Sequence, residues 1–486
     1  MESLQIVETL SVFKYFKEIS IIPRGSGNEK EISNYLVKFA QELNLEVIQD
    51  SAMNVIIKKP ASKGYEGKET IILQGHMDMV CEKNDNIIHD FLKDPLKLKV
   101  KDDYIYAEGT TLGADDGIAV AIIMAILADN TLEHPPIEAL ITTDEERGMT
   151  GAMAVSKEHL NGKIVLNIDN EEEGKLLVSC AGGVRTKSSI AFEKERILFQ
   201  EKIYQLVVKG LKGGHSGSDI DKYRGNANKI LGRLLKRLDE KANINLISIN
   251  GGSKNNAIPR EAKAVVTSIE DEGIMSQIVD EFRQEVVNEL KVQDANIEIL
   301  VDIVNKDIDE KINKRCSRNI INLIYLCPNG VNTMSMSIKD LPESSNNLGV
   351  ITTTENRVML DCLVRSSVES LKNEIANRIQ VLTEQFGGVF EKESDYPGWE
   401  YKNESKFREL CKKVYKEMYD KEPEVYAIHA GVECGILKER LGDLDMVSIG
   451  PDIIDIHTPD ERLSIPSTKR VWEYILEVLK KFWYKL

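Results

Sequence analysis

The 486-residue sequence predicts an α/β fold: a mixed, mostly parallel sheet flanked by helices and interrupted by an inserted α+β domain. Strand and helix signals alternate up to about residue 170, their order changes after residue 184, and the first pattern returns around residue 391. We therefore expect one domain from residues 1–184 and 391–486, and a second domain from residues 185–390.

In the first of these domains, apolar residues at helical spacing predict a helix over 29–43. Short apolar runs predict strands at 54–59, 70–75, 96–100 and 104–108. They are followed by a helix at 117–128, a strand at 137–143, a short helix near 150 and a strand at 163–169. After the insertion we expect a helix at 404–418, strands at 424–429 and 444–450, a helix near 434, and a final helix with Val471, Ile475, Val478 and Phe482 on one face.

The inserted segment has its own order of elements. Strands are expected at 204–210, 244–251 and 262–269, and helices at 226–238 and 274–286. Residues 346–380 repeat the element order of residues 255–284, which indicates a duplicated αβ unit.

Composition restricts the class of protein. The net charge of −16 argues against a nucleic-acid partner, because phosphate binding needs a basic surface. The longest apolar run, at 118–128, is far shorter than the roughly 20 residues that span a bilayer, and the N-terminus lacks the features of a signal peptide. Seven cysteines without a CxxC pair indicate reduced thiols rather than a thiolate metal site. We expect a cytoplasmic protein with no membrane partner.

Three consecutive acids, Asp144, Glu145 and Glu146, follow the apolar strand predicted at 137–143. Like charges this close repel one another unless cations gather there. A solvated turn is the ordinary alternative.

Two further polar pairs sit in similar positions. His76 and Asp78 come just past an apolar strand, where α/β sheets place their binding crevices, and Asp78 could orient a metal-binding His76 through a ring N–H. Asp115 and Asp116 occupy a glycine-flanked loop that leads into an apolar helix, where acids also serve as helix caps.

Asp169 follows another apolar strand, and His457 does so from the far end of the chain. Five strand ends thus each deliver a histidine or a carboxylate, and they converge if the sheet is contiguous. Histidines and carboxylates without cysteine suit a hydrolytic site with two zinc or similar ions. Of Glu145 and Glu146, one could then bind metal while the other accepts a proton from water.

The motifs GHMD (75–78), GADD (113–116), DEERGMTGA (144–152), NIDNEEEG (167–174), CAGG (180–183), GGHSG (213–217) and IHTPDE (456–461) occur in this order along the chain. Together they resemble the M20 metallopeptidases, most closely their aminoacyl-histidine dipeptidase (Xaa-His dipeptidase, peptidase D) branch. The resemblance covers essentially the whole chain. It implies a zinc-peptidase-like catalytic domain interrupted by a lid domain.

The resemblance also implies roles for the acids and histidines. His76 and Asp169 would be terminal ligands of one zinc ion, Glu146 and His457 would hold the other, and Asp115 would bridge both. Asp78 would orient His76, and Glu145 would be the general base. Many relatives have Asn after the bridging Asp, whereas this chain has Asp116, so the bridging role is assigned to Asp115 from the register of the loop.

Four residues of the insertion and its neighbourhood resemble substrate-binding positions of the family. His215 would polarise the substrate carbonyl, Arg365 would pair with the free carboxylate of a dipeptide, and Asn256 and Gly431 would lie near the substrate. For His215 the alternative is a solvated turn, and for Arg365 it is a surface cation at a strand end. His429 is expected to be a core or loop residue.

The activity implied is hydrolysis of dipeptides, preferentially Xaa-His, by a water that bridges two Zn²⁺ per chain, with Co²⁺ or Mn²⁺ as substitutes. The alternatives are another M20-type hydrolase (a tripeptide aminopeptidase, a carboxypeptidase or an N-acyl amino acid amidohydrolase) and an inactive binding protein on the same fold. The expected partners are small peptides, and the insertion is long enough for a doubled lid, so the chain is expected to be a monomer or a homodimer.

Overall fold

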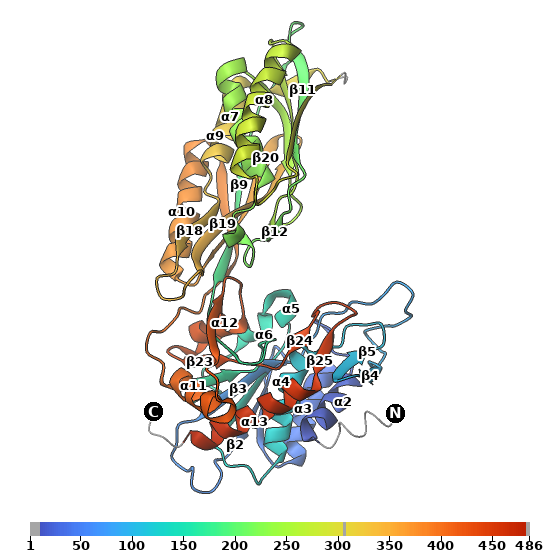
Figure 1. The fold of residues 1–486 in the computed structure, drawn as a ribbon, viewed down its shortest axis with the longest axis vertical. Helices are drawn as coiled ribbons and strands as arrows, with labels where there is room; N and C mark the ends of the chain where they lie inside the picture. Colours follow the sequence, from blue (N-terminus) through green and yellow to red (C-terminus); the bar gives the residue numbers. More distant parts are fainter. Residues whose placement is uncertain (1–9, 305–307, 483–486) are drawn as a thin grey trace. The chain divides into compact units, whose positions relative to one another are not determined.

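A computed structural model describes residues 10–304 and 308–482, and they divide into two compact units (Figure 1). Unit 1 comprises residues 1–178, 401–427 and 432–486, and unit 2 comprises residues 179–400 and 428–431. The prediction that the N-terminus lacks a signal peptide concerns residues 1–9 in part, and these lie outside the described residues.

Unit 1 is built on an eight-stranded sheet in the described residues, with the order β1-β2-β6-β3-β7-β23-β8-β22. The strands are β1 (Glu46–Gln49), β2 (Val55–Lys59), β3 (Ile71–His76), β6 (Ile137–Thr142), β7 (Ile164–Asn167), β8 (Lys175–Cys180), β22 (Glu424–Ile428) and β23 (Asp445–Ser448). The last residues of β8 and β22 belong to unit 2.

The four central strands of this sheet, β6, β3, β7 and β23, run parallel. The outer pairings β1–β2, β2–β6 and β8–β23 are antiparallel, so the sheet is mixed around a parallel centre. The carboxyl ends of the parallel strands meet at one edge, as the registers His76↔Thr142, Gln74↔Asn167 and Asn167↔Ser448 show. This edge is where α/β sheets carry their sites.

The helices of unit 1 are α2 (Ser11–Ser20), α3 (Lys30–Glu42), α4 (Ala114–Ala128), α5 (Glu145–Gly148), α6 (Thr150–Ala154), α11 (Lys406–Tyr419), α12 (Glu433–Leu441) and α13 (Ile465–Lys481). Of these, α3, α4 and α11 contact strands of the large sheet. The apolar run at 118–128 lies in α4, which contacts β3 and α2 and is buried along 114–127, so its apolar character on every side reflects a core position. None of the described helices has both the length and the apolar character needed to cross a membrane.

A smaller sheet of unit 1 has the order β24-β25-β5-β4. Its strands are β4 (Leu98–Lys101), β5 (Tyr104–Ala107), β24 (Ile453–Ile454) and β25 (Arg462–Ser464). The loop between β24 and β25 carries His457, and the pairing of β25 with β5 fixes the end of that loop.

Unit 2 contains a nine-stranded antiparallel sheet in the described residues, with the order β16-β11-β15-β13-β19-β20-β9-β21 and β18 paired to β19. Its strands are β9 (Gly182–Ala191), β11 (Lys202–Lys209), β13 (Asn245–Gly251), β15 (Ala262–Ser268), β16 (Glu298–Ile303), β18 (Gly330–Met334), β19 (Pro342–Thr353), β20 (Arg357–Ser366) and β21 (Val389–Tyr396). Two short pairs accompany it: β10 (Lys194–Arg196) with β17 (Glu310–Ile312), and β12 (Gly214–His215) with β14 (Ala257–Ile258).

Four helices, α7 (Ala227–Ala242), α8 (Glu272–Glu289), α9 (Lys314–Leu326) and α10 (Glu369–Gln385), lie together along one side of this sheet (Figure 1). If the strands β14, β17 and β18 are left aside, the order α7-β13-β15-α8-β16 recurs as α9-β19-β20-α10-β21, with β13 and β19 paired where the halves meet. This repetition matches the duplicated unit that the sequence indicated.

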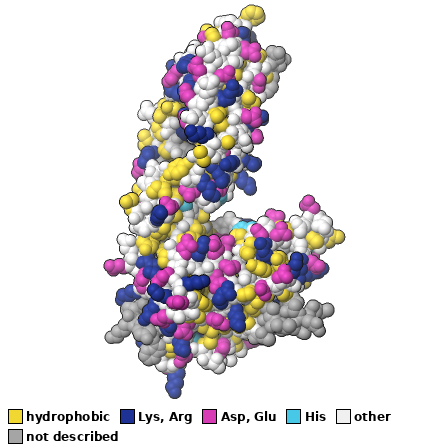
Figure 2. Space-filling model, in the orientation of Figure 1, with side chains coloured by type: hydrophobic (Ala, Val, Ile, Leu, Met, Phe, Trp, Pro, Cys, Tyr) yellow, Lys and Arg dark blue, Asp and Glu magenta, His cyan; other side chains and the backbone are white. Residues whose placement is uncertain are grey.

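Charged side chains of both signs are interspersed over the face drawn in Figure 2. Examples in unit 2 are the ion pairs Arg233–Glu289 and Arg237–Glu285, each 2.7 Å long. Exposed pairs of this kind stabilise a fold by only about 0–1 kcal/mol each. The core beneath, rather than these pairs, therefore holds unit 2 together.

Candidate metal centre

The predicted ligands of unit 1 gather at the carboxyl edge of the parallel strands. His76 is the last residue of β3, Asp169 comes two residues after β7, and Glu145 and Glu146 begin α5, which starts three residues after the end of β6. Asp115 and His457 do not follow strands of this sheet, although the sequence predicted that all these residues would lie at strand ends. Asp115 lies in the first turn of α4 with non-helical backbone angles, and His457 lies in the loop between β24 and β25 with a φ of 60°.

Asp115 lies between the two histidines. Its Oδ1 is 3.2 Å from Nε2 of His76, and its Oδ2 is 3.1 Å from Nε2 of His457. Glu146 completes the second side, since its Oε1 is 3.0 Å from Nε2 of His457. One carboxylate thus faces two separate imidazoles, which is the arrangement needed to bridge two cations.

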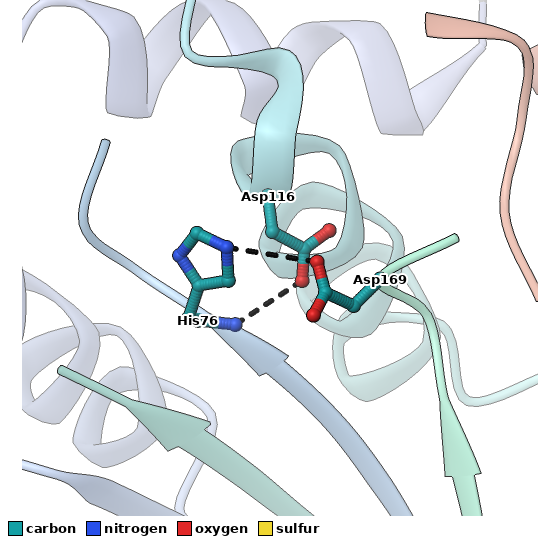
Figure 3. Close-up of side chains that lie close together, drawn as sticks. All are labelled: His76, Asp116 and Asp169. Carbon is teal, nitrogen blue, oxygen red and sulfur yellow. Dashed lines mark hydrogen bonds and ion pairs between the residues drawn. The ribbon is translucent and has the colours of Figure 1, made fainter. Parts of the chain in front are cut away.

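On the first side, Asp169 Oδ1 is 3.6 Å from His76 Nε2. Figure 3 shows the carboxylates of Asp116 and Asp169 beside the His76 ring, and these three residues form one of the groups that could hold an ion. However, Asp116 Oδ2 accepts the backbone N–H of His76 at 3.1 Å. Because Asp116 is engaged by the backbone while Asp115 faces both rings, the geometry favours Asp115 as the bridge.

Asp78 supports the His76 ring from the other side. His76 Nδ1 lies 3.3 Å from Asp78 Oδ1 and 3.2 Å from the Asp78 carbonyl oxygen. The Asp78 carboxylate also accepts hydrogen bonds from the backbone N–H groups of Glu145 and Glu146, at 3.1 and 3.3 Å, and from the Ser26 hydroxyl at 2.7 Å. One buried carboxylate therefore orients a candidate ligand and fixes the backbone of the two glutamates.

The side chains of the three consecutive acids point in two different directions. Asp144, whose φ is 56°, turns away and accepts hydrogen bonds from Arg147 Nε at 2.7 Å and Thr150 Oγ1 at 2.6 Å. Glu145 and Glu146 form a group with His76 whose ligand atoms all lie within 4.8 Å of one another. Of the acids that are adjacent in the sequence, one therefore accepts from Arg147 and Thr150, and the other two face the site.

The electrostatics of the site fit a cation. Burial opposes the charged form of His76, but Asp115 and Asp169 raise its pKa well above the ordinary value. The hydrogen bonds that His457 makes to Asp115 and Glu146 raise its pKa to about 10. Burial raises the pKa of Asp169 to about 6 and that of Glu145 well above its ordinary range. The same negative field attracts divalent cations, and imidazole and carboxylate donors without thiolate match zinc, cobalt or manganese.

Sequence reasoning missed two acids of this region. Glu433, at the start of α12, is fully buried, accepts hydrogen bonds from Gln74 Nε2 at 2.6 Å and Thr142 Oγ1 at 2.7 Å, and leaves Oε1 without a partner. Burial raises its pKa to about 7. Burial and the charges of Asp115 and Asp169 raise the pKa of Glu171 to about 7 as well. Glu171 lies in the NIDNEEEG motif but within a run of three glutamates, and Glu433 is a lone acid at the start of a helix, so the sequence singled out neither residue.

In unit 2, β12 and β14 bring His215 beside Ala257, and Asn256 accepts the backbone N–H of Ser216 at 2.9 Å through its carbonyl oxygen. His215 Nδ1 accepts hydrogen bonds from the N–H groups of Gly217 and Ser218, both at 3.2 Å. Burial and the charge of Arg365 lower the pKa of His215, which favours a neutral ring. The pairing of β12 with β14, two short strands far apart in the sequence, therefore brings His215 and Asn256 close together within unit 2.

Arg365, the penultimate residue of β20, is only 5% exposed, which excludes the surface alternative. Its Nη1 donates to the Tyr396 hydroxyl at 3.0 Å, its Nε has no partner, and no acidic side chain pairs with it among the described residues. Gly431 lies against the same tyrosine, because a Cβ there would sit 2.6 Å from the ring. A buried cation without a counter-ion is costly unless an anion binds beside it.

His429 is buried, as the sequence allowed, with Nε2 2.7 Å from the Ser345 hydroxyl. Burial and the Arg365 charge lower its pKa to about 3, so it stays neutral. His429 is therefore a fixed, neutral polar residue and does not titrate near neutral pH.

A mixed α/β sheet with histidines and carboxylates at its parallel edge is the architecture of a metal-dependent hydrolase. The profile of peptidase family M20/M25/M40 matches residues 72–481, and the chain belongs to this family. It is accordingly a hydrolase that acts on peptide bonds.

Relatives match over the full chain. The chain is 38% identical over 483 residues to the cytosol non-specific dipeptidase of Escherichia coli (strain K12), covering 99% of both chains. The crystal structure of aminoacylhistidine dipeptidase from Vibrio alginolyticus matches with a TM-score of 0.93 and 37% identity, covering 98% of this chain and 97% of that one. Aminopeptidase PepT from Bacillus cereus shares the fold, with a TM-score of 0.58, 17% identity, and coverage of 97% and 98%.

Proposed function

We propose that this protein is a dipeptidase that uses two divalent metal ions, zinc with cobalt or manganese as substitutes, and prefers dipeptides with a C-terminal histidine. The observation that carries the proposal is the likeness along the whole chain to two dipeptidases, at 38% and 37% identity. The names of these relatives differ on specificity, one non-specific and one aminoacylhistidine, so the histidine preference needs its own test. A cytoplasmic location is supported by the name of the Escherichia coli relative.

Asp115 would bridge the two ions, with His76 and Asp169 on one side and Glu146 and His457 on the other. This assignment is supported by the 3.2 and 3.1 Å separations of the Asp115 oxygens from the two histidines. When bound, the ions supply Lewis acidity and lower the pKa of water. The predicted segments 1–184 and 391–486, most of which lie in unit 1, would form the catalytic domain, and the inserted 185–390, which lies in unit 2, would form the lid.

Glu145 would act as the general base. It removes a proton from the attacking water, whose oxygen forms a bond to the peptide carbonyl carbon, and the C–N bond then breaks as Glu145 returns the proton to the leaving nitrogen. Its raised pKa, caused by burial and by Asp169 and Glu433, suits a group that must both accept and return a proton. Asp78 keeps His76 oriented and holds the Glu145 backbone in place.

Arg365 would receive the free carboxylate of the peptide. The support is a buried guanidinium without an acidic partner, beside the Tyr396 hydroxyl and the close approach at Gly431. Guanidinium groups bind carboxylates in a two-pronged geometry that lysine cannot copy. His215 as the donor to the substrate carbonyl, and Asn256 near it, stay predictions from the family motifs.

The test is amino acid release by metal-loaded protein from Gly-His, β-Ala-His, Gly-Leu, Gly-Gly-His and N-acetyl-Gly-His. We expect cleavage of the free dipeptides, fastest for the histidine forms, with the tripeptide and the blocked peptide spared. Equal rates on Gly-His and Gly-Leu would remove the histidine preference. Cleavage of the blocked peptide alone would indicate an N-acyl amidohydrolase, and cleavage of the tripeptide alone a tripeptide aminopeptidase.

A further inference from the structure

A single carboxylate holds the loop that carries the candidate bridging ligand. Glu461 is 2% exposed and accepts four successive backbone N–H groups. Its Oε2 accepts those of Leu112 and Gly113 at 2.7 and 3.0 Å, and its Oε1 accepts those of Ala114 and Asp115 at 2.8 and 3.3 Å. The amides at the start of α4 have no partners within the helix, so Glu461 satisfies them from another part of the chain.

A buried arginine acts on the same loop from the side of β3. Arg24 is 1% exposed, and its Nη2 donates to the Gly113 carbonyl at 2.5 Å. Its Nη1 donates to the Met77 carbonyl at 3.0 Å and lies 3.4 Å from the Asp78 carbonyl. Burial lowers the pKa of Arg24, and the charge of Glu461 offsets this more than any other group does.

Glycines leave room for this arginine. A Cβ at Gly113 would lie 2.7 Å from Arg24 Nη2, and one at Gly117 would lie 2.4 Å from the same atom. Gly113 also has a φ of 64°, which an L side chain rarely adopts. The sequence around Asp115 is therefore shaped to admit the guanidinium.

We propose that Arg24 and Glu461 are positioning residues that hold three ligand-bearing segments in register. Arg24 joins the segment of His76 to the Asp115 loop, and Glu461 joins the Asp115 loop to the segment of His457, four residues before it. Through these contacts the spacing of the two histidines about the Asp115 carboxylate is set before any ion binds. Neither residue is placed to bind metal or substrate.

This inference rests on the metal centre proposed above. Its rival is a purely structural role, in which the two buried charges stabilise unit 1 without bearing on metal affinity. The rival is plausible because removing one partner of a buried charged network is strongly destabilising wherever it occurs. A test must therefore separate metal affinity from stability.

Glu461→Gln is the sharpest variant. It keeps the shape, but its amide –NH₂ would face two of the four backbone N–H donors, so that pair loses its acceptor. The matched control is Glu138→Gln, because Glu138 is 3% exposed and accepts the N–H groups of Asn161 and Gly162 at 2.8 and 2.9 Å, at the opposite end of β6. Both variants disturb a buried carboxylate that holds a loop, and only one of these loops carries Asp115.

The measurements are Mn²⁺ and Zn²⁺ titration by calorimetry, melting of the metal-free protein, and kcat and KM of the loaded enzyme. We expect Glu461→Gln to weaken the binding of at least one of two ions by about 10- to 100-fold. It should also lower kcat more than it changes KM. Glu138→Gln should change Tm but leave metal affinity within about 2-fold of the wild type, well below the loss that a lost orienting contact causes.

The positioning role would be overturned if Glu461→Gln left metal affinity and kcat unchanged and lowered only Tm, as the control does. If Glu461→Gln does not fold, Arg24→Lys is measured in the same way, since lysine keeps the charge but cannot reach Gly113 and Met77 together; normal affinity there would also overturn it. A wild type that binds fewer than two ions would instead refute the proposed centre, and the positioning role with it.

Discussion

Glu433 gives a stability prediction that follows from the chemistry of one side chain. Its carboxylate is fully buried, and burial together with the charges of Asp169 and Asp78 raises its pKa to about 7, against 4.5 for an exposed glutamate. The folded state therefore holds a proton that the unfolded chain releases. The resulting stability is fully present below about pH 4.5 and is lost as the pH rises through about 7.

Glu433→Gln removes this dependence while keeping the shape. The amide oxygen can still accept from Gln74 and Thr142, and the –NH₂ group takes the place of the unpartnered Oε1. Between about pH 5.5 and pH 8 the wild type should lose about 2 kcal/mol of unfolding free energy that the variant keeps.

The assay is urea unfolding of the metal-free wild type and variant at both pH values, followed by circular dichroism. As the pH rises from 5.5 to 8, the unfolding free energy of the wild type should fall relative to that of the variant by about 2 kcal/mol. A difference that is the same at both pH values would show that Glu433 does not carry a raised pKa, and our account of the buried network behind the site would be wrong.

The remaining predictions concern the site itself. Glu145→Gln should lower kcat by roughly 10²- to 10⁴-fold because the general base is lost, while calorimetry still finds two ions; loss of an ion would mean that Glu145 is a ligand. Asp115→Asn should reduce the metal content measured by atomic absorption by at least one ion, since a neutral amide cannot bridge two cations, and unchanged content would point to Asp116 instead. Arg365→Lys should raise KM for Gly-His by about 10-fold or more through the lost two-pronged contact. Arg185→Lys, on neighbouring β9 and already paired with Asp361, is its control, and equal KM values for the two variants would refute the carboxylate site.

Much of the site was legible in the sequence because parallel strands impose a simple rule. A polar residue directly after an apolar strand lies at the carboxyl edge, so His76, Asp169 and the acids after β6 could be grouped from their order alone. The same rule failed in detail for Asp115, which sits in the first turn of a helix, and for His457, which is carried by a small second sheet. Asp144 is another exception to the rule. Its backbone is left-handed, and its side chain accepts hydrogen bonds from Arg147 and Thr150.

The supporting residues could not be found this way. Arg24, Glu433 and Glu461 act through contacts with residues 89, 359 and 349 positions away along the chain. No local pattern marks such a partner, because the energetic reason for each residue is a buried group that only the folded chain brings near. The division of unit 2 into two like halves was easier, since the repeated element order is itself a sequence pattern.

The most direct test of the central claim is anomalous scattering at the zinc edge from a crystal of the zinc-loaded protein. The account predicts two peaks roughly 3.5–4 Å apart on either side of the Asp115 carboxylate, one next to His76 and Asp169 and the other next to Glu146 and His457. A single peak, or two peaks that do not share Asp115, would contradict it.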